Sequence, residues 1–154
     1  MPEFVLDRGT AESARHFESL DTFTQAYIEA LFFTEAEHGT VTERESTSPR
    51  VRVWNPETDS SLPGDIDFSD LAPETLAHII ADCAAFQADA TAAAYIDDLD
   101  AQAGHDFWLT RNGHGAGFWD GNWPEPGASY LDARSKASGG IDVYLGDDGK
   151  VYLS

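Results

Sequence analysis

The sequence predicts an α+β domain in which a small antiparallel sheet of two β-hairpins packs against two to three helices. The hairpins are predicted at about 105–119 and 141–153, because each segment has an Asn-Gly or Asp-Gly turn dipeptide between short apolar runs. The two longer helices are predicted at about 22–37 and 73–95, where apolar residues recur at helical spacing.

The chain has the length and composition of one folded domain. Its 154 residues are enough for a sizeable core, and 42% of them are hydrophobic. Residues 1–20 show no clear period and predict a mobile acidic arm with a short helical turn at 11–20, so the folded domain is expected to span 21–154. The single cysteine, Cys83, excludes a disulfide within the chain and favours the cytosol. The first residues lack the features of a secretion signal, and no apolar run is long enough to cross a membrane.

The first helix has both a start and a stop signal. Asp21 or Thr22 can cap its first turn, and Gly39 follows its last apolar position. The next segment, 40–64, is rich in Thr, Ser, Pro and Gly and predicts a long loop. Within this loop, residues 51–54 alternate in polarity and predict a short edge strand.

The second helix has the most regular pattern in the chain. Pro73 suits its first turn, and Glu74 is favourable at the positive end of the helix dipole. Its apolar residues share one arc of about 120°. Cys83 lies at the centre of this arc, so the thiol is expected to be a small buried hydrophobe rather than a nucleophile. A third, shorter helix is predicted at about 128–137, before a Ser-Gly-Gly stop.

The predicted hairpin at 105–119 is the most distinctive part of the chain. With its turn at 112–113, aromatic residues lie on both of its faces. A sheet with one wet face normally alternates apolar with polar residues, so a second aromatic face indicates a recognition surface. Trp and Arg dominate the energetics of protein interfaces. The predicted partner-binding residues are Trp108, Trp119, Trp123, Arg111, His114, Asp106 and Asp120.

The net charge of −19 restricts the class of partner. An excess of carboxylates repels nucleic acid and anionic lipid, so we expect no direct nucleic-acid binding and no membrane binding. The expected partner is a protein with a basic surface, which negative charge attracts at long range. Solubility, or adaptation to high salt, is the alternative explanation of the acidity. The predicted acidic surface comprises Glu74, Asp82, Asp89, Asp97, Asp98 and Asp100.

Two sequence runs resemble a family of small proteins encoded by tailed bacteriophages and prophages. They are GHDFWLTRNGHGAGFWD at residues 104–120 and YLGDDGKVY at residues 144–152, and segments 24–30, 70–76 and 121–126 are also similar. The resemblance implies a phage accessory protein that acts in the cytoplasm of the bacterial host, with no catalytic residue and no cofactor. The leading hypothesis is therefore an acidic phage protein that binds a basic host protein. Inhibition of a defence or DNA-processing factor, including DNA mimicry against a restriction or CRISPR complex, is one form of this activity.

Two other classes of function stay open. The first is a small hydrolytic or metal-dependent enzyme that uses His105 and Asp120, which oppose each other across the predicted hairpin, or His114 with Arg111. No nucleophile, metal or phosphate motif accompanies these residues. The second is a self-assembling structural module, in which an edge strand at 51–54 or 152–153 pairs between copies.

Overall fold

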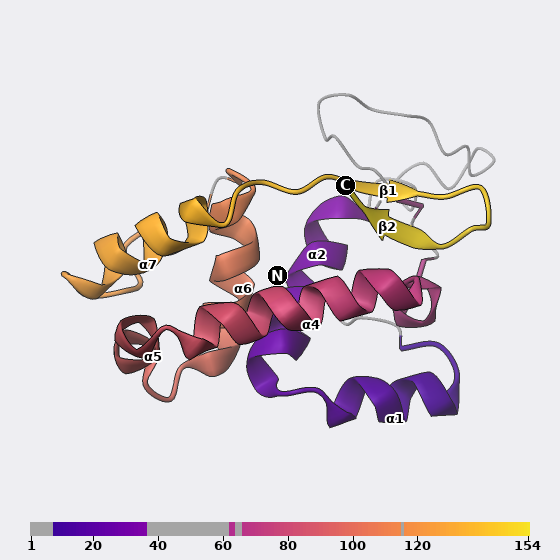
Figure 1. Ribbon diagram of the computed structural model, residues 1–154, viewed down its shortest axis with the longest axis horizontal. Coiled ribbons are helices and arrows are strands. Elements are labelled where there is room, and N and C mark those ends of the chain that lie inside the picture. Colours follow the sequence, from indigo (N-terminus) through magenta and orange to yellow (C-terminus); the bar gives the residue numbers. More distant parts are fainter. Residues whose placement is uncertain (1–7, 37–61, 64–65, 115) are drawn as a thin grey trace, which may run out of the picture.

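The computed structural model describes residues 8–36, 62–63, 66–114 and 116–154, and it is mostly helical (Figure 1). One two-stranded antiparallel sheet accompanies the helices in these residues. In chain order the elements are α1 (Ala11–Ser19), α2 (Thr22–Glu35), the 3₁₀ turn η1 (Phe68–Asp70), α4 (Pro73–Ala88), α5 (Ala90–Ile96), α6 (Asp100–Arg111), α7 (Gly127–Ala137), β1 (Val143–Leu145) and β2 (Val151–Leu153). Among the described residues, no helix combines the length and the apolar character that a membrane span needs.

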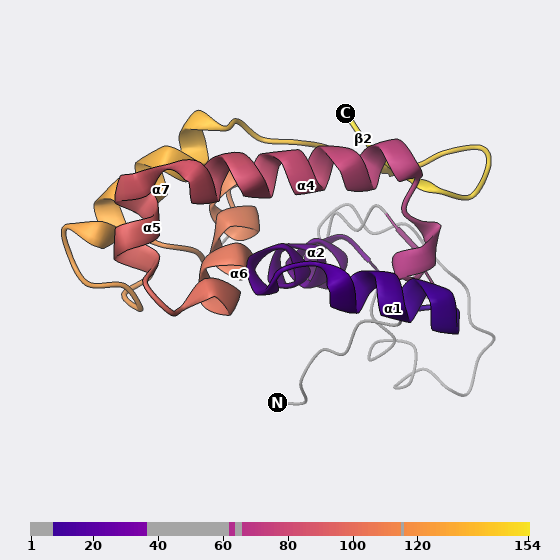
Figure 2. The same cartoon turned by 60° about the horizontal axis from the view of Figure 1, so that its bottom comes forward.

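Helices α2, α4 and α6 meet around the core, and α4 runs along one side of the molecule (Figure 2). In Figure 1, α5 and α7 lie at one end of α4 and the β-hairpin lies at the other. Helix α2 begins at its predicted cap, because the Asp21 carboxylate accepts a hydrogen bond from Thr24 N–H at 2.8 Å. Helix α7 also forms close to its predicted position.

The core is an aromatic cluster contributed by α2, α4 and α6. The rings of Phe86 and Phe107 have centroids 4.4 Å apart, and Tyr27 meets Trp108 edge to face at 5.3 Å. Helices α2 and α6 approach so closely that a Cβ atom at Gly104 would lie 2.0 Å from the Phe23 carbonyl oxygen. Glycine is therefore the residue that permits this contact.

The predicted hairpin at 105–119 is wrong, because its first half is the C-terminal part of α6. Asn112 caps this helix, and Gly113, at φ +71°, donates its N–H to the Thr110 carbonyl at 3.2 Å. His114 N–H donates to the Leu109 carbonyl at 3.0 Å, which completes a Schellman motif. The Asn-Gly signal thus ends a helix instead of joining two strands, since both structures need a left-handed glycine.

The burial of α6 on all sides explains why the sequence shows no helical alternation of apolar and polar residues there. Every residue from 106 to 111 is buried, because α2, α4 and α7 cover different sides of the helix. A helix that is covered all round has no polar stripe. Its run of apolar and aromatic residues is therefore hard to distinguish from a buried strand.

Two helix predictions need smaller corrections. The helix expected at 73–95 is interrupted at Asp89, which ends α4 and caps α5 by accepting hydrogen bonds from Thr91 N–H and Ala92 N–H. The arm expected at 1–20 contains α1, whose Phe17 is fully buried against Phe68 at a ring distance of 5.1 Å. Residues 1–7, most of the loop expected at 40–64 and the strand expected at 51–54 lie outside the described residues.

The C-terminal hairpin is confirmed, so the α+β class holds with one hairpin in the described residues where the sequence predicts two. Tyr144 pairs with Tyr152 at its centre, and Gly149 adopts φ +82° in the turn. On its other side β2 meets the start of α4, where the Val151 carbonyl accepts hydrogen bonds from Ala72 N–H and the Thr75 hydroxyl. Strand β2 therefore has a neighbour on each side at Val151.

Candidate binding surface

The segment that follows α6 is held in place by two aromatic anchors. Phe118 is fully buried and stacks with Phe86 at 6.0 Å, and it meets Trp123 at 5.2 Å. Its N–H donates to the Thr110 hydroxyl oxygen at 3.0 Å. A Cβ atom at Gly117 would lie 2.2 Å from the same oxygen, so this approach requires glycine. Residues 117–123, called the Trp119 loop below, are consequently tied to the core at both ends.

Trp119 points away from the core between these anchors. Its exposed fraction is 53%, the largest among the large hydrophobic side chains of the described residues. A turn holds it there, since Asp120 N–H donates to the Gly117 carbonyl at 3.3 Å. The Asp120 carboxylate accepts from Gly117 N–H at 3.2 Å and from the Asn122 amide at 3.0 Å. The loop therefore displays an indole from a backbone that is already ordered.

The other predicted contact tryptophans are interior residues. Trp108 is fully buried and donates its indole N–H to the Thr34 hydroxyl at 2.8 Å. Trp123 is 4% exposed and donates its indole N–H to the buried Asp106 carboxylate at 2.7 Å. Trp108 packs against Tyr27 of α2 and Trp123 packs against Phe118, so neither ring, nor the buried Asp106, is available to a partner at the surface.

Arg111 is also an interior residue and connects four segments. Its guanidinium donates to Asp82 at 2.8 Å, to the Tyr27 hydroxyl at 3.1 Å, and to the carbonyls of Gly139 and Ser138 at 2.8 and 3.1 Å. Burial raises the pKa of the Tyr27 phenol above its ordinary value, so Tyr27 stays neutral beside the ion pair. These contacts indicate a structural role for Arg111.

The structure does not bring together the residues of the predicted enzyme site. His105 lies on α6 with Nδ1 3.9 Å from the Asp106 carboxylate, whereas Asp120 is bonded within its own turn. His114 Nε2 lies 3.9 Å from the Glu35 carboxylate, while Arg111 binds Asp82. Among the described residues, no three His, Cys, Asp or Glu side chains are grouped in a way that could hold a metal ion.

Cys83 has the environment expected of a structural thiol. It is fully buried, and burial raises the pKa of the thiol above its ordinary value. The thiolate is the nucleophilic form of cysteine, and a buried site disfavours it.

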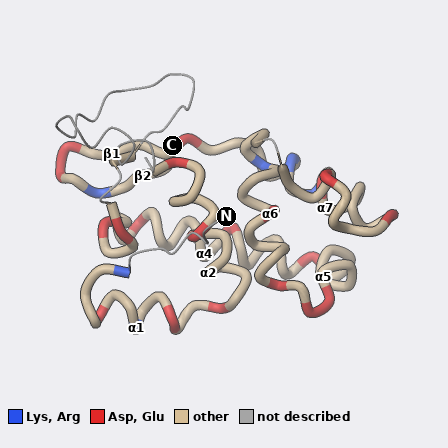
Figure 3. The backbone as a smooth tube through the Cα atoms, turned by 180° about the vertical axis from the view of Figure 1, so that it is seen from behind, with Lys and Arg blue, Asp and Glu red and all other residues tan. Residues whose placement is uncertain are grey.

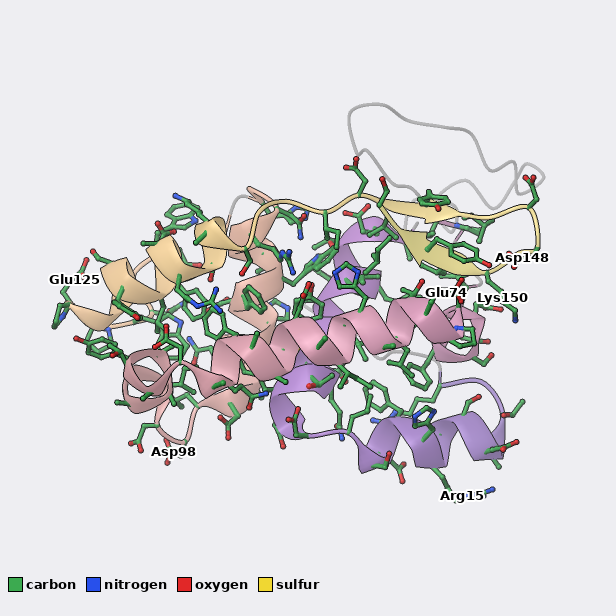
Figure 4. All side chains as sticks on the ribbon, in the orientation of Figure 1. Arg15, Glu74, Asp98, Glu125, Asp148 and Lys150 are labelled. Carbon is green, nitrogen blue, oxygen red and sulfur yellow. The ribbon has the colours of Figure 1, made fainter. Side chains whose placement is uncertain are left out.

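The predicted acidic residues occupy separate parts of the surface. In Figure 4, Glu74 lies beside the hairpin with Asp148, whereas Asp98 and Glu125 lie at the opposite end of the molecule. Asp82 pairs with Arg111, and Asp89 caps α5 and contacts Arg134. Figure 3 shows Asp and Glu on α1, on the hairpin, near α5 and on α7. The acids are thus spread over several elements. Close neighbours in the chain are Asp97, Asp98 and Asp100, which surround the turn between α5 and α6.

The spacing of Lys and Arg along the sequence predicts that the surroundings of Trp119 are negatively charged. Between residues 53 and 133 the only Lys or Arg is Arg111. Because Arg111 is 7% exposed and bound to Asp82, this long section contributes no exposed Lys or Arg. Trp119 therefore lies in a section of the chain that exposes Asp and Glu side chains but no Lys or Arg side chain.

The arrangement offers a partner two kinds of contact, the face of an exposed indole and the charge of carboxylates. Both attract cationic groups, the indole through its quadrupole and the carboxylates through ion pairing. Both are carried by backbone that the core already orders, so binding needs little rearrangement of the loop. Comparison of the chain with models of protein families, with curated proteins and with solved structures gave no match.

Proposed function

We propose that this protein is an acidic, phage-encoded accessory protein that binds a basic host protein through the Trp119 loop. The observation that carries the proposal is the 53% exposure of Trp119 between two buried anchors. An exposed tryptophan on ordered backbone is typical of an interface hot spot, because little entropy is lost when it is covered. The resemblance of residues 104–120 and 144–152 to phage proteins supports the phage origin.

The charge of the chain supports a basic partner. A net charge of −19 attracts positive surfaces at long range and increases the association rate at low salt. Basic surfaces that bind DNA are common on defence and DNA-processing proteins, and inhibition of such a factor is the biological role that we propose. The carboxylates are spread over several elements, so they attract a basic protein without fixing where it binds. Trp119 supplies the defined point of contact.

The proposal is tested by comparing the wild-type protein with the Trp119→Ala variant. Each is immobilised and exposed to a bacterial host lysate at low and at high salt. We expect the wild type to retain a basic protein at low salt, and we expect Trp119→Ala to weaken this binding by about tenfold or more. High salt should weaken it further by screening.

The matched control is Tyr144→Ala, which removes an exposed ring, 46% accessible, from the hairpin at the other end of α4. This variant should retain the partner. A circular dichroism melt of each variant verifies that it is folded. Equal retention of the partner by wild type and Trp119→Ala would refute the proposal.

A further inference from the structure

We infer that the partner contacts the Trp119 loop with an arginine side chain, and that Asp120 selects arginine over lysine. This inference rests on the proposed function and deepens it. It depends on the position of a fixed carboxylate next to the exposed indole. The occupant follows from charge complementarity, because the loop carries one acid, Asp120, and no Lys or Arg.

The Asp120 carboxylate is ordered but retains the capacity to bind a cation. One oxygen accepts a hydrogen bond from Gly117 N–H and the other accepts one from the Asn122 amide. Each oxygen has two lone-pair directions, so each keeps one for a further donor. The side chain is exposed, and within the described residues it forms no ion pair with Lys, Arg or His. A carboxylate with an acceptor position left on each oxygen suits the two-pronged guanidinium better than the single ammonium.

Trp119 adds a second basis for selecting arginine. A guanidinium is planar and can stack on the indole face while its edge reaches the neighbouring carboxylate. An ammonium is attracted to the same ring, but it is more strongly hydrated and has no plane to stack. Trp119 and Asp120 are consecutive and both are exposed, so we expect one long arginine side chain to contact both.

Two other places with exposed aromatic rings, at Tyr130 and at Tyr144, lack this combination. The carboxylate next to Tyr130 is Asp89, which already accepts the Tyr130 hydroxyl at 2.8 Å and contacts Arg134 at 3.5 Å. The carboxylate beside the Tyr144–Tyr152 pair is Asp148, which accepts the Tyr152 hydroxyl at 2.6 Å. In both places the acid is bonded to the aromatic side chain itself. At Trp119 the neighbouring acid is bonded instead to Gly117 N–H and to the Asn122 amide.

The test uses the full-length protein and two capped peptides of equal length, one alternating glycine with arginine and the other glycine with lysine. Binding is followed by NMR through the indole N–H resonances, and the Trp119 signal is assigned with Trp119→Phe. We expect the arginine peptide to bind about fivefold more tightly than the lysine peptide. It should shift the Trp119 signal, and the resonances of the bonded indoles of Trp108 and Trp123 should not move.

Two variants separate the role of Asp120 from a general charge effect. Asp120→Asn removes the charge and can keep both hydrogen bonds if the Asn122 amide turns over, so the loop should stay folded. Asp120→Asn should abolish the preference, so that the arginine and lysine peptides bind with about equal affinity. Glu125→Gln removes a different exposed charge, which is bonded to Ser129, and should leave the preference unchanged.

The outcomes distinguish the inference from the proposed function. If both peptides shift the Trp119 signal with equal affinity, arginine selection is overturned and the proposed site stands. If Asp120→Asn retains the full preference, the role of Asp120 is overturned. If neither peptide shifts the Trp119 signal, the loop is not the binding site and the proposed function fails with the inference.

Discussion

The guanidinium of Arg111 donates a hydrogen bond to the Asp82 carboxylate at 2.8 Å and so joins the end of α6 to the middle of α4. The side chain of Arg111 is 4% exposed and that of Asp82 is 26% exposed. Water therefore screens the pair only in part. His78 Nε2 lies 3.2 Å from the same oxygen of Asp82, on the solvent side of the pair. This relationship makes Arg111 a stability determinant, although its residue type and position in the sequence suggested a binding role.

Replacing Arg111 with methionine should strongly destabilise the fold. The variant leaves the Asp82 carboxylate without its buried partner and leaves the carbonyls of Ser138 and Gly139 without a donor. We expect the free energy of unfolding to fall by about 3 kcal/mol in urea titrations. Arg134→Met is the matched control, because Arg134 is more exposed and its 3.5 Å contact with Asp89 should contribute about 1 kcal/mol or less. Similar losses for both variants would contradict the assigned role of Arg111.

The two tryptophans Trp108 and Trp119 should respond in opposite ways to truncation. Trp108→Ala opens a cavity in the core and removes the donor to Thr34, so we expect a loss of about 3–5 kcal/mol. Trp119→Ala removes an exposed ring and should change stability by about 0.5 kcal/mol or less. Thermal melts of both variants check this. If Trp119→Ala unfolds the protein, Trp119 belongs to the core and the binding surface is refuted.

Replacing Asp97 with glycine should stabilise the protein. Asp97 has φ +56° and ψ −115°, a conformation that side-chain-bearing residues rarely adopt and that glycine adopts without strain. Relief of this strain should raise the free energy of unfolding by about 1 kcal/mol, after the entropy cost of glycine in the unfolded chain. Asp98→Gly, at the next position, removes the same charge without this benefit and should not raise the melting temperature. A lower melting temperature for Asp97→Gly than for the wild type would disprove the assignment of strain.

The contribution of Asp89 to stability should depend on pH in the acidic range. Hydrogen bonds from Ala92 N–H and from the Tyr130 hydroxyl hold the pKa of the Asp89 carboxyl below its ordinary value of 3.8. A carboxyl with a lowered pKa in the folded state stabilises that state above its unfolded pKa. This stabilisation is lost as the pH falls through the folded pKa.

The measurement for Asp89 compares urea unfolding of the wild type and of Asp89→Asn from neutral pH to below pH 3.8. The wild type should be the more stable protein near pH 7, and the difference should shrink as Asp89 becomes protonated. Using the difference removes the effect of the other carboxylates, which titrate in both proteins. A difference that stays constant over this range would show that Asp89 does not act through its charge.

Local signals within a few residues were sufficient for part of the fold. The cap at Asp21 predicts where α2 begins, and Pro73 predicts the start of α4. The Asp-Gly dipeptide at 148–149 predicts the turn between β1 and β2, and this hairpin forms with Tyr144 opposite Tyr152. In each case the hydrogen bonds or backbone angles that decide the structure are made by neighbouring residues.

At Asn112 and Gly113 the local sequence was insufficient to predict whether a helix ends or a hairpin turns. A left-handed glycine after asparagine suits a two-residue hairpin turn and also suits the end of a helix. The helix forms because α2, α4 and α7 pack around α6. Gly104 allows the close approach of α2, since a Cβ atom at this position would collide with the α2 backbone. The packing of distant helices selects between two structures that the dipeptide permits equally.

The sequence by itself determined the negative charge, the start of the long helices and the C-terminal hairpin, since these follow from composition and from neighbouring residues. Only the tertiary structure decided that Trp108 and Arg111 are inside while Trp119 is outside. Trp108 bonds to Thr34 and Arg111 bonds to Tyr27, partners 74 and 84 residues away. Whether a side chain is buried depends on which distant elements cover it, and no periodicity within a single element contains that information.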